Sequence, residues 1–224
     1  MILNNHSSLR GKHATLSPSS PSFMGLEADD IRARIYSKLR MAMGTEIHEF
    51  AFYKIEERGK VTSARDVVRS LKDYIFKKYY IEEIRALSFE GRRLLKVLSY
   101  LPKEVFETVH DYINDAIGFR MEAEVTLAMS DRMFGHADAL IFQDKFLRIH
   151  DLKTGSVPAK IDQLLGYDAL YCYEYHVNPF EIEHELRIYQ NGDILVSNPT
   201  GEIIQPLIDK LIECDNILKE FEEV

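Results

Sequence analysis

The sequence contains no tryptophan and only two cysteines, Cys172 and Cys214. Two cysteines exclude a disulfide framework, and they exclude an iron–sulfur cluster held by four cysteines of one chain. No apolar run reaches ~18 residues, the length that a membrane-spanning helix needs. The N-terminal segment also lacks the apolar stretch of a secretory signal. We therefore expect a cytoplasmic protein without a membrane among its partners.

Basic residues are in the minority. The chain has 28 Lys and Arg against 36 Asp and Glu, a net charge of −8. This balance argues against broad, non-specific binding of nucleic acid. Any surface for nucleic acid must therefore be a confined basic patch. The sequence offers two helical clusters for it: Lys77, Lys78, Arg92, Arg93 and Lys96. The alternative is that these charges form ordinary solvated helix faces.

The first half of the chain has a helical pattern. We interpret residues 1–25 as an irregular, Ser/Pro-rich segment and residues 26–224 as a single domain, since 46% hydrophobic residues suffice for one sizeable core. Apolar spacing predicts helices over about 27–58, 63–80, 88–100 and 103–117. Gly59 is the expected stop of the first helix, and Ser63 with Asp66 resembles a capping box that opens the second. These helices form a predicted layer over about 26–118.

The pattern changes after about residue 119. Strands are predicted over 121–128, 133–142, 146–152, 181–189 and 193–196, with a helix over 160–176 between the third and fourth and a last helix over 201–222. Asn191-Gly192 between the last two strands is a strong hairpin signal. The expected fold class is α/β: a mixed β-sheet core flanked by helices, over about 119–224, with the N-terminal helical layer packed on it.

The segment from Asp138 to Lys153 carries the chemistry. Side chains alternate along a strand, so Asp151 and Lys153 share one face. A two-residue turn at either 143–144 or 144–145 leaves Asp138 on that face, opposite Asp151 or one step diagonal to it. Such neighbours lie ~5 Å or ~7–8 Å apart, so two carboxylates there can share a hard divalent cation. Lys153 could then position water or stabilise charge on a phosphate. The alternative is an exposed strand with ordinary charges.

Other polar residues could complete this site. Gln163 and Tyr167 lie on one face of the predicted 160–176 helix, although a partly buried Tyr beside a solvated Gln is the more ordinary explanation. His48 follows Gly44 by one helical turn. A lone helical His is more often structural, but with two carboxylates it forms a set that accepts Mn²⁺ readily and Mg²⁺ with more water. Glu122 and Glu124 could reach a second metal or form a solvated edge.

Four short motifs follow one another along the chain, and their order is informative: Gly44-x-x-x-His48, Gly135-x-x-Asp138, Asp151-x-Lys153-Thr-Gly, and Gln163-x-x-x-Tyr167. Together they resemble the RecB-like branch of the PD-(D/E)XK nuclease superfamily. Residues 12–20, Lys-His-Ala-Thr-Leu-Ser-Pro-Ser-Ser, resemble the opening of phage and prophage exonucleases of this superfamily. The chain lacks the Trp and Cys that often follow this segment in relatives of the phage type, and it lacks the iron–sulfur cysteines of other relatives.

The resemblance implies a restriction-endonuclease-like fold and a set of residue roles. It implies that His48, Asp138, Asp151 and the Leu152 carbonyl bind Mg²⁺ or Mn²⁺. It also implies that Lys153 is catalytic and that Gln163 and Tyr167 act near the substrate. The candidate catalytic residues are therefore Asp138, Asp151, Lys153, Gln163 and Tyr167.

The resulting functional expectation is a metal-dependent deoxyribonuclease, favoured as an exonuclease that acts on DNA ends in phage recombination or replication inside a bacterial host. An endonuclease of the same fold and a catalytically inactive DNA-binding or assembly protein are the alternatives. A non-nuclease enzyme with a His/Asp/Asp metal site has no substrate-specific signal in the sequence. By resemblance, the partners would be DNA, a single-strand annealing protein, and further copies of the chain in a homo-oligomer.

Overall fold

The structure, a computed structural model, describes residues 16–18 and 21–222. It is a mixed α/β fold, so the expected fold class is confirmed. The described elements are η2 (Pro21–Phe23), α1 (Ala28–Glu56), α2 (Ala64–Tyr79), β1 (Tyr80–Ile81), η3 (Glu82–Ile84), β2 (Ala86–Leu87), α3 (Phe89–Leu98), α4 (Lys103–Gly118), β3 (Glu122–Ser130), β4 (Met133–Gln143), β5 (Phe146–Lys153), α5 (Asp162–Glu174), β6 (Glu183–Gln190), β7 (Asp193–Ser197) and α6 (Gly201–Glu222).

The five longer strands form one sheet in the order β3-β4-β5-β6-β7. Its neighbours are antiparallel except β5 and β6, which run parallel and are joined through α5. Gln143 pairs with Phe146, so the turn between β4 and β5 is Asp144–Lys145, with φ of 52° and 63°. Positive φ at both central residues is typical of a type I′ turn, whose twist matches the strands it joins. This turn selects one of the two registers that the sequence allowed.

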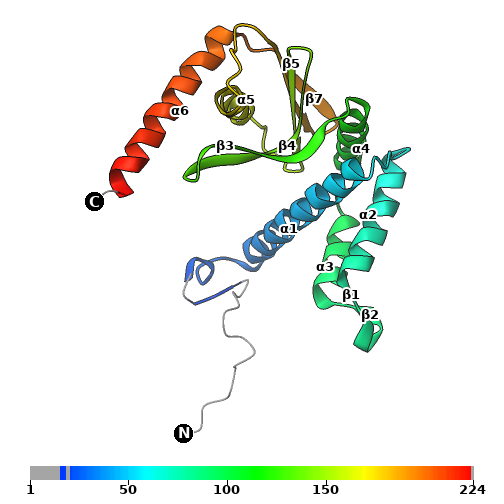
Figure 1. Cartoon of the computed structure of the whole chain (residues 1–224). Helices are drawn as coiled ribbons and strands as arrows, with labels where there is room; N and C mark the ends of the chain where they lie inside the picture. The colour runs from blue at the N-terminus through cyan, green and yellow to red at the C-terminus, as the bar shows by residue number, and fades with distance from the viewer. Residues whose placement is uncertain (1–15, 19–20, 223–224) are drawn as a thin grey trace.

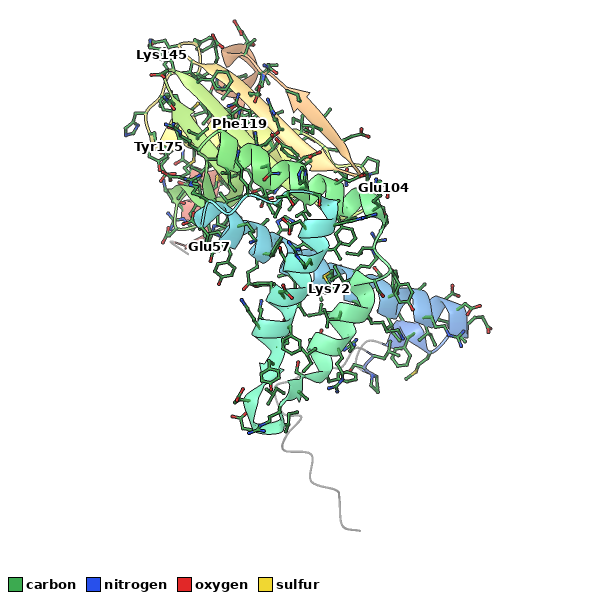
Figure 2. The ribbon with its side chains drawn as sticks, turned by 90° about the vertical axis from the view of Figure 1, so that its right-hand side faces the viewer. Glu57, Lys72, Glu104, Phe119, Lys145 and Tyr175 are labelled. Carbon is green, nitrogen blue, oxygen red and sulfur yellow. The ribbon has the colours of Figure 1, made fainter. Side chains whose placement is uncertain are left out.

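The sheet is covered on both faces (Figure 1). Helix α5 lies on one face, with α6 packed outside it; α4 lies on the other, and α1 crosses beside β3. Helices α2 and α3 pack on α1 and α4 rather than on the sheet. Figure 2 shows α4 running in front of the strands from Glu104 to Phe119, while the helix that carries Lys72 extends away from them.

Two apolar cores hold these layers together. The helical layer shares a core with one face of the sheet, and α5 shares a second core with the other; the first includes Leu152 and the second Ile149. Ile149 and Leu152, an odd number of positions apart on β5, therefore point into different cores, as strand alternation requires. The end of β5 is positioned from both sides, which matters because Asp151 and Lys153 belong to that end.

Helix ends follow local chemistry. The Ser63 side chain accepts a hydrogen bond from the Asp66 amide at 3.2 Å, which confirms the expected cap of α2. The expected stop of α1 needs a correction. Arg58, not Gly59, adopts the left-handed conformation with φ of 53°, and Gly59 donates to the Lys54 carbonyl at 2.9 Å. That 6→1 bond defines a Schellman ending, so the helix stops where expected with arginine in the strained position.

The sequence predicted an irregular N-terminal segment over residues 1–25 that contains an exonuclease-like motif. Most of residues 1–25, including most of the Lys12–Ser20 motif, lies outside the described residues. The part that is described contains the short η2 turn. Among the described helices, none combines the length and the apolar character needed to cross a bilayer.

Candidate metal-dependent active site

Asp138 and Asp151 face each other where two strands separate. The pairing of β4 with β5 ends at Ala139 and His150, so the two aspartates occupy the next opposed positions. There the Leu152 amide donates to Oδ2 of Asp138 at 2.8 Å. Of the two arrangements that the sequence allowed, this is the directly opposed one. The Leu152 backbone thus belongs to the same cluster as both carboxylates.

Asp151 is only 3% exposed. Burial raises its pKa to about 6, and the nearby charge of Asp138 adds to this rise, against the opposing effects of Lys153 and His48. One of its oxygens, Oδ2, is buried without a hydrogen bond. The Lys153 ammonium lies 2.9 Å from that oxygen, but its hydrogen bond goes to Oδ1 at 3.0 Å. The Lys153 ammonium therefore pairs with Asp151, while Asp138 accepts from the Leu152 amide.

Lys153 links β5 to α5. Besides Asp151, its ammonium donates to Oε1 of Gln163 at 2.8 Å, and Nε2 of Gln163 donates to the Tyr167 hydroxyl at 2.9 Å. A Cβ built on Gly135 would lie 2.6 Å from the Tyr167 ring. Only glycine permits that approach. The structure thus joins three of the four motifs in one chain of contacts.

The fourth motif belongs to α1. A Cβ on Gly44 would lie 2.9 Å from Oγ1 of Thr154, so the glycine lets α1 pass close to the end of β5. One turn later, Nδ1 of His48 lies 3.5 Å from Oδ2 of Asp138. Burial lowers the pKa of His48, but the hydrogen bond and charge of Asp138, with the charge of Asp151, outweigh burial and raise it. His48 is thereby brought to the carboxylate pair.

The two glutamates of β3 differ in their placement. Glu124 lies between the pairs Ala123–Ala139 and Val125–Ala137, which sets it across from Asp138, and its φ is 53°. Burial raises its pKa, and the charge of Asp138 raises it further. Both glutamates are exposed, but Glu122 pairs with Leu140, one residue pair beyond Ala139 and away from Asp138. Of the two, Glu124 is the carboxylate that the structure brings to the cluster.

These residues suit a divalent cation, although not through side chains alone. Within residues 16–18 and 21–222, no three His, Cys, Asp or Glu side chains converge tightly enough to hold a metal ion by themselves. Hard cations such as Mg²⁺ accept carboxylates, backbone carbonyls and waters together. The carboxylate of Asp151, the opposed Asp138 and the adjacent Leu152 backbone supply donors of this kind. The arrangement therefore fits a cation with several water ligands.

The two basic clusters that the sequence offered as candidates for a nucleic-acid surface lie on α2 and α3, which pack on other helices rather than on the sheet. Lys78 is held by Glu46 at 3.0 Å and by Glu49. Arg92 donates to the Leu87 carbonyl, and Arg93 pairs with Glu90; Lys77 and Lys96 are exposed on α2 and α3, which pack away from the sheet. These basic residues therefore lie on the helices that pack outside the sheet.

Sequence reasoning missed Arg40. It lies one turn before Gly44 and two before His48, and all three line one groove beside the site. Residues four apart on a helix share a face, so the spacing Arg40-Gly44-His48 carried this signal. The four-residue spacing places Arg40 on the same helix face as His48, a candidate metal ligand, and this pattern could have indicated Arg40 from the sequence.

Comparison with known families assigns the chain to a family whose description names no activity. Its fold is a mixed sheet flanked by helices, with carboxylates gathered where two strands separate. A family described as "Protein of unknown function (DUF2800)" matches residues 35–190, well over half of the chain, so the protein belongs to this family. No curated protein and no solved structure matches it.

Proposed function

We propose that this protein is a metal-dependent DNA nuclease of the PD-(D/E)XK superfamily, from its RecB-like branch. One observation carries the proposal: two opposed carboxylates, Asp138 and Asp151, share a buried strand end with the ammonium of Lys153. Two carboxylates this close repel each other when both are ionised. That repulsion adds to the effect of burial, which raises the pKa of Asp151 to about 6, and a purely structural ion pair does not need it. Sites that bind a cation and act on phosphate need both charges together.

The roles follow from the contacts. Asp138, Asp151, His48 and the Leu152 carbonyl would hold Mg²⁺ or Mn²⁺. When bound, that ion supplies Lewis-acid polarisation of the phosphate and a lower pKa for the attacking water. Lys153, held by Gln163, presents its ammonium beside the carboxylates, where it can orient the water or offset charge on the phosphate. The Tyr167 hydroxyl steadies Gln163 by accepting a hydrogen bond from its amide.

The mode of cleavage is proposed as exonucleolytic, on the basis of the resemblance of residues 12–20 to the opening of phage and prophage exonucleases. The test is to incubate the full chain with end-labelled linear DNA and with closed circular DNA, each with Mg²⁺, Mn²⁺ or EDTA. The proposal predicts metal-dependent loss of linear DNA and intact circles. Nicked circles would make it an endonuclease. Absence of metal-dependent cleavage of both substrates would overturn the nuclease assignment and favour a DNA-binding or assembly protein.

A further inference from the structure

A groove of about 680 Å³ runs along α1 beside the candidate site. One wall is α1, from Ser37 through Arg40 to His48, and the other is the segment from Thr154 to Val157 that follows β5. Because His48 and Thr154 belong both to the groove and to the surroundings of the carboxylates, the groove ends at the site. A ligand lying in it would point towards Asp138.

The walls combine one cation with hydroxyl groups. Arg40 is half-buried, and it has no hydrogen bond or ion pair within the part of the chain that the structure describes. Its helical neighbours differ, since Arg32 pairs with Asp29 at 2.6 Å and Arg34 donates to Ser22 at 2.7 Å. Guanidinium groups bind phosphate through two parallel hydrogen bonds. The groove therefore presents an uncommitted phosphate-binding group.

The remaining lining suits the other parts of a nucleotide. Ser37 and Ser156 offer hydroxyls that can donate to phosphate oxygens. Met41 and Val157 are 72% and 80% exposed, and apolar side chains of this kind can pack against sugars and base faces. One groove therefore combines a charged group, hydroxyls and apolar side chains, the three kinds of group that contact a nucleic-acid strand.

The size of the groove selects a single strand. Its volume falls in the ~300–1,000 Å³ range of clefts that enclose small organic ligands. One or two nucleotides belong to that size class. A duplex does not, because it carries two backbones separated by grooves, of which the major one alone is ~12 Å wide. The volume of the groove therefore suits an unpaired strand better than duplex DNA.

We infer that this groove binds the single-stranded end of a DNA substrate, with Arg40 on a phosphate neighbouring the one at the carboxylates. The inference rests on the proposed function, because it takes DNA as the substrate, and it adds a strand preference and a positioning residue. Arg40 contacts the strand away from the reacting atoms, so it serves binding and placement. The net charge of −8 makes such a local contact necessary, since the protein as a whole repels DNA.

Binding measured in EDTA isolates this contact from cleavage. The probes are a fluorescent single-stranded oligonucleotide and a blunt duplex of the same sequence, titrated at several salt concentrations. We expect wild type to prefer the single strand. Arg40→Ala should weaken single-strand binding by about 10-fold to 100-fold, the effect of a lost charged hydrogen bond. It should also reduce the salt slope by about 0.7, and Arg40→Lys should recover part of the affinity.

Two further variants serve as a matched control and as a second test of the groove. Arg65→Ala removes the same charge from an exposed position on α2, outside the groove, and should bind as wild type does. Val157→Glu places a negative charge on the opposite wall at an exposed loop position. It should weaken single-strand binding even where Arg40→Ala fails to fold.

The outcomes separate this inference from the proposed nuclease activity. Equal binding by Arg40→Ala, Val157→Glu and Arg65→Ala, or tighter binding of blunt duplex by wild type, would overturn the groove assignment whether or not the protein cuts DNA. Conversely, selective loss of single-strand binding by the groove variants supports the assignment even if the cleavage assay shows no nuclease.

Discussion

Lys153 on β5 and Gln163 on α5 share a hydrogen bond of 2.8 Å between the ammonium and Oε1. This contact ties the position of a lysine at a strand end to a helix on the same face of the sheet. Gln163 is itself held by the hydroxyl of Tyr167, whose ring packs against Gly135. The ammonium is therefore oriented by three elements rather than by Asp151 alone.

The first prediction concerns that orientation. Gln163→Ala should lower the DNA cleavage rate by about 10-fold to 100-fold, the usual effect of losing a group that orients an active-site residue. The loss should fall on kcat, with KM nearly unchanged, because the lysine stays present but loses its fixed position. Gln205→Ala on α6, where the amide donates to Asp209, is the matched control. A change in KM alone would assign Gln163 to substrate binding instead.

The second prediction concerns His48. Its imidazole lies 3.5 Å from Asp138, so His48→Ala should weaken Mn²⁺ binding at least about tenfold, as measured by calorimetry. His136→Ala is the control: this exposed histidine of β4 bonds to the Thr126 hydroxyl at 2.9 Å. Unchanged Mn²⁺ affinity in His48→Ala would reduce His48 to a structural partner of Asp138.

The third prediction follows from the raised pKa of Asp151. Its carboxyl titrates near 6 in the folded protein and near ~3.9 when unfolded, so its proton is bound more tightly in the folded state. That stabilisation is complete below pH ~4 and is lost as the pH rises to about 6. Without metal, ionised Asp151 should destabilise the fold by about 3 kcal/mol at pH 7 relative to pH 4.

Unfolding in EDTA against pH tests this directly. Asp151→Asn should remove that part of the pH dependence and exceed wild type in free energy of unfolding at pH 7. Added Mg²⁺ should stabilise wild type and leave the variant nearly unaffected. A constant difference between the two proteins from pH 4 to 7 would show that the carboxyl is not strained by ionisation.

The fourth prediction concerns Gly135. A methyl group there would lie 2.6 Å from the Tyr167 ring, so Gly135→Ala should destabilise the protein by about 1–3 kcal/mol and displace Tyr167. Gly166→Ala is the control beside Tyr167, in open space on α5. It should stabilise the helix by up to about 1 kcal/mol. Thermal unfolding of both variants checks the pair, and equal stability would mean that the ring moves freely.

Much of the fold could be predicted from short-range pattern. The helices and long strands follow from apolar spacing, and Ser63 marks the start of α2 because a side-chain cap is a local interaction. The register between β4 and β5 could not be chosen, because Gln143-Asp144 and Asp144-Lys145 are both plausible turns. The choice depends on packing of both sheet faces. The two-residue strands β1 and β2 are too short to show any periodicity.

The site was predictable in its members but not in its contacts. Strand parity predicted that Asp138, Asp151 and Lys153 could meet, and the structure adds that Leu152 donates to Asp138. The backbone irregularity at Glu124 leaves no mark in the sequence. The sequence did not show that Lys78, a member of one basic cluster, pairs with carboxylates of α1. These carboxylates lie about thirty residues earlier in the chain. Long-range pairing of this kind has no local pattern.

The most direct test of the central claim compares wild type with Lys153→Ala on end-labelled linear DNA in Mn²⁺, with Mn²⁺ binding measured on both. The account predicts that wild type degrades the DNA and stops in EDTA. It predicts that Lys153→Ala binds Mn²⁺ but cleaves at least about 100-fold more slowly. Degradation at the wild-type rate by Lys153→Ala, or none by wild type, would contradict it.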